Sequence, residues 1–227
     1  MSSADAARLR LFQLVSPALP VGAFSYSEGL EVLVQRGAIA GAEALEHWLS
    51  DELRRGAVAL EAAGLSALQN ALRLHQGGGA DLSAAAELDG WLLAQREAAE
   101  VRAQQRQMGQ SLLQLLADLG WPLGPGAPPL AWPAAFAWAS LCLEIGSPAM
   151  EEAYLYSWVA NQISAAVRLV PLGPTQGQRL QLALAPLIAE QAQDLAQQDP
   201  RQLHNGGVGA GLAQLQHAEL YSRLFRS

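Results

Sequence analysis

The chain has 227 residues, of which 51% are hydrophobic and 15% charged, and its formal net charge is −7. This composition predicts a folded globular protein with an apolar surface, and the acidic balance excludes a general attraction to nucleic acid or anionic membranes. All 14 basic residues are arginine, so the lysine of a phosphate-binding loop and the amine of Schiff-base chemistry are both absent.

Residue usage also predicts the fold class. Threonine occurs once, at Thr175, and isoleucine is scarce, whereas alanine, leucine and glutamine dominate. These preferences favour helices over sheets, so we expect an all-α protein. The single cysteine, Cys142, lies in an apolar stretch and is expected in the core. Because neither a signal peptide nor a membrane span is recognisable, we expect a cytoplasmic protein.

The N-terminal third begins with a short predicted helix over 8–15, followed by a turn at Pro20 and Gly22. The spacing of Ser25 and Glu28 is that of a capping box, which predicts a helix that starts there and ends at Gly37. Phe24 and Tyr26 lie on either side of Ser25 in this loop, either as a plug for the core or as a contact for a partner.

Helical periodicity then continues through the middle of the chain. Residues 42–75 predict two helices with a break or close contact at Gly56 or Gly64, and residues 83–119 predict one long helical run. The charged residues of that run are interpreted mainly as a solvated face, with partner contact left open; they are Arg96, Glu97, Glu100, Arg102 and Arg106.

A Pro- and Gly-rich loop at 120–133 precedes a helix over 134–145 and a long core helix over 154–170. Four polar residues follow one face of the core helix at steps of four, three and four: Ser157, Asn161, Ser164 and Arg168. Either neighbouring helices supply hydrogen-bond partners for these four side chains, or the side chains border a hydrated internal passage. Tyr154 and Tyr156 stand at the start of this helix, where a ring can keep its hydroxyl in water.

The last third predicts a helix over 176–198 that Pro186 should kink, then a mobile glycine-rich segment at 205–211. The final residues include Tyr221, Leu224 and Phe225, which would form the apolar face of a short helix. Such a helix must dock on something because it is too short to be stable alone. The full prediction is a single domain over 1–227, a bundle of roughly eight to ten helices with a mobile N-terminus and a docking tail from about 206 to 227.

The residues give no sign of catalysis. The four histidines are scattered singly, so no metal site is predicted, and no nucleophile motif or phosphate cradle is present. No carboxylates are paired in an apolar setting that would raise a pKa. We therefore expect a protein that is not an enzyme and has no resident cofactor.

Three separated blocks resemble the urease accessory protein F family. They are LPVGAFSYSEGLE at 19–31, NQISAAVRLVPLG at 161–173 followed by Gly177 and Gln178, and ELYSRLFRS at 219–227. Their order and spread over nearly the whole chain make the resemblance specific.

The resemblance implies a scaffold that helps to mature urease by GTP-dependent nickel incorporation. Its expected partners are the urease apoprotein complex, the urease-bound accessory protein D/H and the nickel-carrying GTPase G, and it is expected to be a homodimer with nickel only as cargo in transit. The alternative is a regulator that activates the GTPase with an arginine near the nucleotide. The residues that the resemblance and their positions suggest for partner contact are Phe24, Tyr26, Tyr156, Tyr221, Arg223, Leu224, Phe225 and Arg226.

Overall fold

The computed structural model of the chain describes residues 3–78 and 81–227 and contains, within them, ten α-helices, two short 3-10 helices and no strands. The predicted all-α class is confirmed. The α-helices are α1 (Ser3–Leu14), α2 (Leu30–Gln35), α3 (Ala42–Arg55), α4 (Ala57–Gln76), α5 (Ser83–Ala94), α6 (Ala99–Asp118), α7 (Trp132–Cys142), α8 (Ala149–Leu169), α9 (Pro174–Leu195) and α10 (Val208–His217). The 3-10 helices are η1 (Ala23–Ser25) and η2 (Pro200–Gln202).

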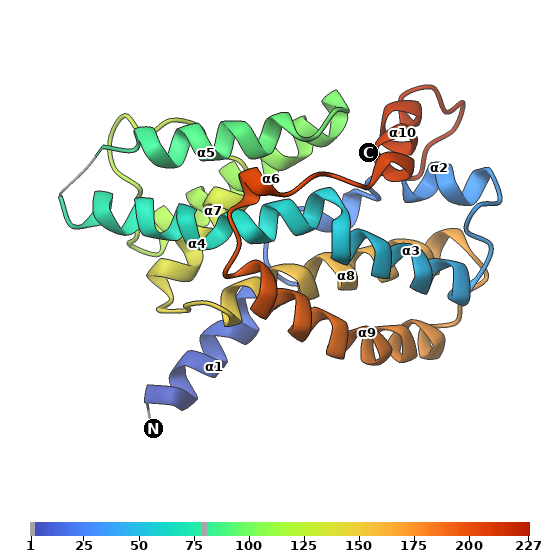
Figure 1. Cartoon of the computed structure of the whole chain (residues 1–227), viewed down its shortest axis with the longest axis horizontal. Coiled ribbons are helices and arrows are strands. Elements are labelled where there is room, and N and C mark those ends of the chain that lie inside the picture. Colours follow the sequence, from blue (N-terminus) through green and yellow to red (C-terminus); the bar gives the residue numbers. More distant parts are fainter. Residues whose placement is uncertain (1–2, 79–80) are drawn as a thin grey trace.

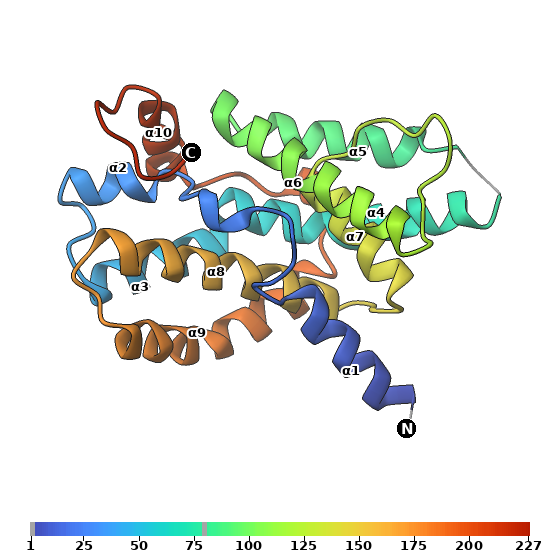
Figure 2. The ribbon, with the colours of Figure 1, turned by 180° about the vertical axis from the view of Figure 1, so that it is seen from behind.

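Helices α4 and α8 pack together in the middle of the bundle (Figure 1). Helix α4 also contacts α3, α5, α7 and α9, and α8 contacts α1, α2, α3, α7 and α9. One contiguous cluster of buried apolar side chains extends from Leu14 to Phe225. Seen from behind, α1 projects from one edge of the bundle, whereas α2 and α10 lie together at the opposite end (Figure 2). None of the helices in the described part of the chain is long and apolar enough to cross a membrane.

Close helix packing depends on a few glycines. A Cβ at Gly109 of α6 would lie 2.6 Å from the Leu130 carbonyl oxygen, so only glycine lets α6 approach the start of α7. A Cβ at Gly64 of α4 would lie 2.7 Å from a methyl carbon of Leu92 in α5. Gly64 is therefore a close-packing point inside α4, and the helix break of this region occurs at Gly56, where α3 ends and α4 begins.

The predicted helix boundaries are wrong in three places. The capping box of Ser25 and Glu28 does not form, because Ser25 lies in η1, the helix begins at Leu30, and Glu28 has φ +50° with its side chain turned inward. The long run at 83–119 is interrupted between Ala94 and Ala99. The glycine-rich segment predicted to be mobile forms α10 from Val208 onward.

Helix α9 runs from Pro174 through Pro186 to Leu195, close to the expected bounds of 176–198. Two further elements differ from expectation. Residues 218–227 are not helical in the structure, and their backbone instead bonds to side chains of the core. The core helix begins at Ala149, five residues before the predicted start, because Glu151 and Glu152 complement the positive end of its dipole.

Candidate functional site: a partner-binding surface over a buried ionic cluster

The C-terminal tail, defined as residues 218–227, lies on the loop before α2 and on the α2 helix itself. Glu31 in α2 accepts hydrogen bonds from the backbone nitrogens of Leu224 at 2.7 Å and Phe225 at 3.0 Å. Ser27 donates through its own backbone nitrogen, at 2.9 Å, and through its hydroxyl, at 2.7 Å, to the Ser227 backbone oxygen. The last residues of the tail are thus tied to the first family-like block, at 19–31, about 200 residues away in sequence.

A histidine anchors the start of the tail. His217 is fully buried, with Nδ1 2.8 Å from a carboxylate oxygen of Glu100 in α6 and Nε2 3.4 Å from Glu31 in α2. The other Glu100 oxygen accepts from Arg223 at 2.7 Å. Helix α2, helix α6 and the start of the tail are therefore joined at His217 and Glu100. The expectation that the histidines are isolated overlooked this contact, because Glu31, Glu100 and His217 are far apart in sequence.

The polar stripe of α8 contacts the same loop and tail. Asn161 donates to the Tyr26 carbonyl at 3.3 Å, and Arg168 donates to the Phe24 carbonyl at 3.2 Å while its guanidinium lies 4.5 Å from the Phe225 ring centroid. Ser157 bonds the Ala153 carbonyl of its own helix. The four residues do not line one passage, since Ser164 and Arg168 lie on the exposed surface.

Two of those polar residues do border an internal space. Ser157 and Asn161 line a cavity of about 50 Å³ together with Glu28 and Glu61. A cavity of this size and polarity has room for a water molecule or two.

The burial of the predicted partner residues divides them into two groups. Tyr26 and Phe225 are 4% exposed and belong to the core, where burying rings of this size stabilises the fold. The others lie at the surface, namely Phe24, Tyr156, Tyr221, Arg223, Leu224 and Arg226. Tyr221, Arg223, Leu224 and Arg226 thus form the outward face of the tail, while its backbone and Phe225 face inward.

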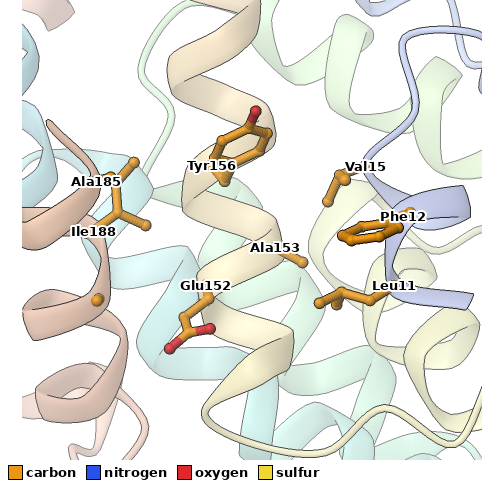
Figure 3. A pocket seen from close by; sticks show the side chains of 9 residues that line it. Leu11, Phe12, Val15, Glu152, Ala153, Tyr156, Ala185 and Ile188 are labelled. Carbon is orange, nitrogen blue, oxygen red and sulfur yellow. The ribbon is translucent and has the colours of Figure 1, made fainter. Parts of the chain in front are cut away.

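A groove of about 410 Å³ lies between α1, α8 and α9 (Figure 3). The rings of Phe12 and Tyr156 stand on α1 and α8 at its border, and Ile188 covers the α9 side. Phe12 is 56% and Tyr156 41% exposed, so this groove presents large apolar side chains to its surroundings. Exposed apolar clusters of this kind are typical of protein contact sites.

Beneath the loop and the tail lies an ionic cluster that was not predicted. Arg96, 3% exposed, donates from Nε and one terminal nitrogen to the two carboxylate oxygens of Glu61 in α4 at 2.7 and 2.9 Å, and its other terminal nitrogen lies 3.3 Å from Glu28. Tyr154 donates to Glu61 at 2.8 Å, and Trp158 donates to Glu28 at 3.2 Å. Arg96 was interpreted as part of a solvated face, and its inward turn explains the break between α5 and α6.

The electrostatics of the cluster follow from burial and charge pairing. Burial by itself would lower the pKa of Arg96, but the adjacent Glu61 and Glu28 carboxylates outweigh it and raise that pKa, so the guanidinium stays charged. Burial, followed by the charge of Glu61, raises the pKa of the Tyr154 hydroxyl well above its ordinary value. Tyr154 therefore acts as a hydrogen-bond donor within the core. One feature of the sequence could have indicated this buried cluster: Glu61 is the only charged residue between Ala57 and Leu72.

A second buried carboxylate supports the fold. Asp89 of α5 accepts a hydrogen bond from the Ala131 backbone nitrogen at 2.9 Å, directly before α7. Burial raises the pKa of Asp89 to about 6. Together with Glu52, discussed below, it corrects the expectation that no carboxylate has a raised pKa.

Removing the Glu31 carboxylate should release the tail from the core. We expect Glu31→Ala to lower the free energy of unfolding by about 1–3 kcal/mol, because two buried backbone donors lose their acceptor. Hydrogen exchange at the Leu224 and Phe225 amides should accelerate. Glu43→Ala, an exposed position on α3, is the matched control; unchanged exchange in Glu31→Ala would show that other contacts hold the tail.

Within the described residues no group of three or more His, Cys, Asp or Glu side chains is placed to hold a metal ion. The clustered features are instead a tethered tail with an exposed outer face, an apolar groove and a buried ionic cluster. This combination suits contact with other proteins.

Comparison with known proteins adds the family. Residues 39–185 match the family model UreF. The chain is similar to proteins named urease accessory protein UreF from Nostoc sp. (41% identity, covering 96% of this chain and 95% of the relative), Alkalilimnicola ehrlichii (42%, 97% and 96%) and Thermosynechococcus vestitus (40%, 98% and 99%). The resemblance found in three short blocks therefore extends over the whole alignment.

Proposed function

Because this chain belongs to the UreF family of urease accessory proteins, we propose that it is an assembly factor for the maturation of urease. The family is one of accessory proteins and not of catalytic enzymes. The observation that carries the proposal is 40% or greater identity to such proteins over nearly the full length. We further propose that the chain works in the cytoplasm and bridges a urease-bound accessory protein D/H and the GTPase G, with nickel as cargo and not as a resident cofactor.

The surface features support a bridging role because they lie on different sides of α8. Phe225 of the tail contacts Arg168 near the C-terminal end of α8, whereas the groove lies beside Ala153 and Tyr156 near its N-terminal end. Two partners could therefore bind at the same time without competing. We propose the outer face of the tail for the urease-bound accessory protein and the start of α8 for the GTPase.

A reconstituted activation assay tests this function. Urease apoprotein, the accessory proteins D/H and G, nickel and GTP are combined with and without this chain, and urease activity is measured. Activity that depends on this chain supports the proposal, and equal activity without it contradicts the proposal. GTP turnover measured in the same mixtures tests the alternative: stimulation by orders of magnitude on adding this chain would identify a GTPase activator.

Tyr156→Asp should weaken binding of the GTPase. The aspartate places a charge in an apolar groove, and losing a central aromatic contact typically costs more than about 1–2 kcal/mol of binding free energy, or about tenfold or more in affinity. Pull-down with purified GTPase measures the effect. Leu74→Asp, at an exposed apolar position on α4, is a matched control. Wild-type binding by Tyr156→Asp would remove this residue from the interface.

We also propose that the chain forms a homodimer. Helix α1 offers exposed Leu9, which does not line the groove proposed for the GTPase, and a second copy could cover this part of α1. Light scattering of the purified chain gives the mass directly, and a monomer at all concentrations would contradict this proposal.

A further inference from the structure

A second pocket, of about 390 Å³, lies where the segment before α10 crosses the junction of α3 and α4. In Figure 1 this segment is the red stretch that runs from η2 to α10. It is held in place by the Gly206 backbone nitrogen, which donates to the Arg55 carbonyl at 2.7 Å. Apolar walls come from Ala57, Ala94 and Leu212. The carboxyl groups of Glu52 and Glu97 line the pocket, and so do the side chains of Arg96, His204 and Asn205.

Glu52 is the unusual member of this pocket. Its side chain lines the pocket although the residue is only 7% exposed. Among the residues that the structure describes, no hydrogen bond or ion pair reaches its carboxyl group. The two carboxyl oxygens of Glu52 are not among the fully enclosed unpaired atoms of the described residues, so they are reached from the pocket.

Two glycines make room for this carboxyl group. A Cβ at Gly56 would lie 2.1 Å from its Oε2 atom, and a Cβ at Gly207 would lie 2.9 Å from its Oε1 atom. The backbone therefore encloses the carboxyl group on two sides. The same carboxyl group also lines the pocket.

The charges around Glu52 leave the site short of positive charge. Arg96 is engaged by Glu61 and Glu28, and Arg55 pairs with Asp51 at 3.0 Å. Glu28 and Asp51 add negative charge from the loop before α2 and from α3, and Glu97 and His204 face the same pocket. Burial raises the pKa of the Glu52 carboxyl group to about 7. The positive charge of Arg96 lowers this pKa, whereas the negative charge of Glu28 raises it further.

We propose that this pocket binds a protonated alkylamine or alkylguanidinium group, the end of a lysine or arginine side chain or of a free amine, with Glu52 as its counter-ion. The alkyl stem would lie along Ala57, Ala94 and Leu212, and the cationic head would meet the Glu52 carboxylate. This chain contains no lysine, so a lysine ammonium must come from a different protein. The site stands independently of the assembly role proposed above.

Titration with n-butylammonium tests the site on the full chain. Binding is followed by NMR at the Gly56 and Gly207 amides, with uncharged n-butanol as the matched ligand. Glu52→Gln should weaken n-butylammonium binding by at least about tenfold, because it removes one member of a buried charge pair. Glu43→Gln, at an exposed position of the same helix, should leave the affinity unchanged.

The pH dependence gives an independent readout. Because a proton on Glu52 competes with the cation, the affinity should rise about tenfold from about pH 6 to pH 8, and this rise should vanish in Glu52→Gln. Equal affinity of wild type and Glu52→Gln, or equal binding of n-butanol and n-butylammonium, would overturn the proposal.

The same variants distinguish a partner side chain from a free amine. Once amine binding by the wild type is established, Glu52→Gln is added to the reconstituted assembly with urease apoprotein and the accessory proteins. Weakened assembly identifies a basic side chain of a partner as the occupant. Intact assembly together with lost n-butylammonium binding identifies a small free amine.

Discussion

Replacing Arg96 by methionine should lower the free energy of unfolding by about 3–5 kcal/mol, because it leaves two buried carboxylates without their cation. Glu61 would lose both hydrogen bonds from the guanidinium, and Glu28 would lose its ion pair. Methionine fills much of the arginine volume, so a cavity contributes little to the loss. Denaturant unfolding followed by circular dichroism measures the change.

A double-mutant cycle separates the charge pair from general damage. Arg96→Met combined with Glu61→Gln should be more stable than the sum of the single changes predicts, since the second change removes a carboxylate that the first left unpaired. Arg54→Met, at an exposed position on α3, should change stability by no more than about 0.5 kcal/mol. A loss of similar size in Arg54→Met and Arg96→Met would show that the buried cluster does not stabilise the fold.

Glu52→Gln should stabilise the protein at alkaline pH by up to about 3 kcal/mol and leave it unchanged at acidic pH. The ordinary pKa of this glutamate is 4.5, and burial raises it to about 7 in the folded chain. Between these values the folded state binds more protons than the unfolded state, so stability falls as the pH rises and the loss is complete above the folded pKa. Glutamine stays neutral, so the variant avoids this loss.

Unfolding curves at several pH values test the prediction. The difference in stability between wild type and Glu52→Gln should grow from about pH 5 to pH 8. Glu43→Gln is the control because its side chain is exposed on the same helix. Parallel pH profiles of wild type and Glu52→Gln would mean that Glu52 titrates normally and that its carboxyl group is solvated.

Arg96 and Glu52 are both buried, but they differ in how their charges are compensated. Arg96 is buried with two carboxylates and with hydrogen-bond donors from Tyr154 and Trp158 around them, so its cluster is satisfied. Glu52 belongs to the same region, but within the described part of the chain its carboxyl group forms no hydrogen bond or ion pair. The first is expected to hold the fold, and the second to respond to a ligand or a proton.

The helices were largely predictable, and their boundaries were less so. Alanine- and leucine-rich periodicity is a local property, which is why α3, α4, α6 and α9 appear close to their expected positions. The break between α5 and α6 was missed because Arg96 has no local reason to leave the helix. It turns inward to reach Glu61, 35 residues earlier in the chain.

The candidate site was only partly predictable, for the same reason. The structure brings the first and the third of the family-like blocks into direct hydrogen-bond contact. Whether an aromatic residue in such a block faces inward could not be read from spacing alone. Tyr26 and Phe225 are buried, whereas Phe24 and Tyr221 are exposed.

The sequence by itself determined the all-α class, most of the helices and the family, because helix propensity, apolar periodicity and short motifs are all properties of neighbouring residues. Only the tertiary structure decided that His217 lies between Glu31 and Glu100, that Arg96 is enclosed by Glu61 and Glu28, and that Glu52 is buried at the edge of a pocket. Charge pairing and desolvation depend on which segments meet in space, and the energy of a buried charge is set almost entirely by those distant neighbours.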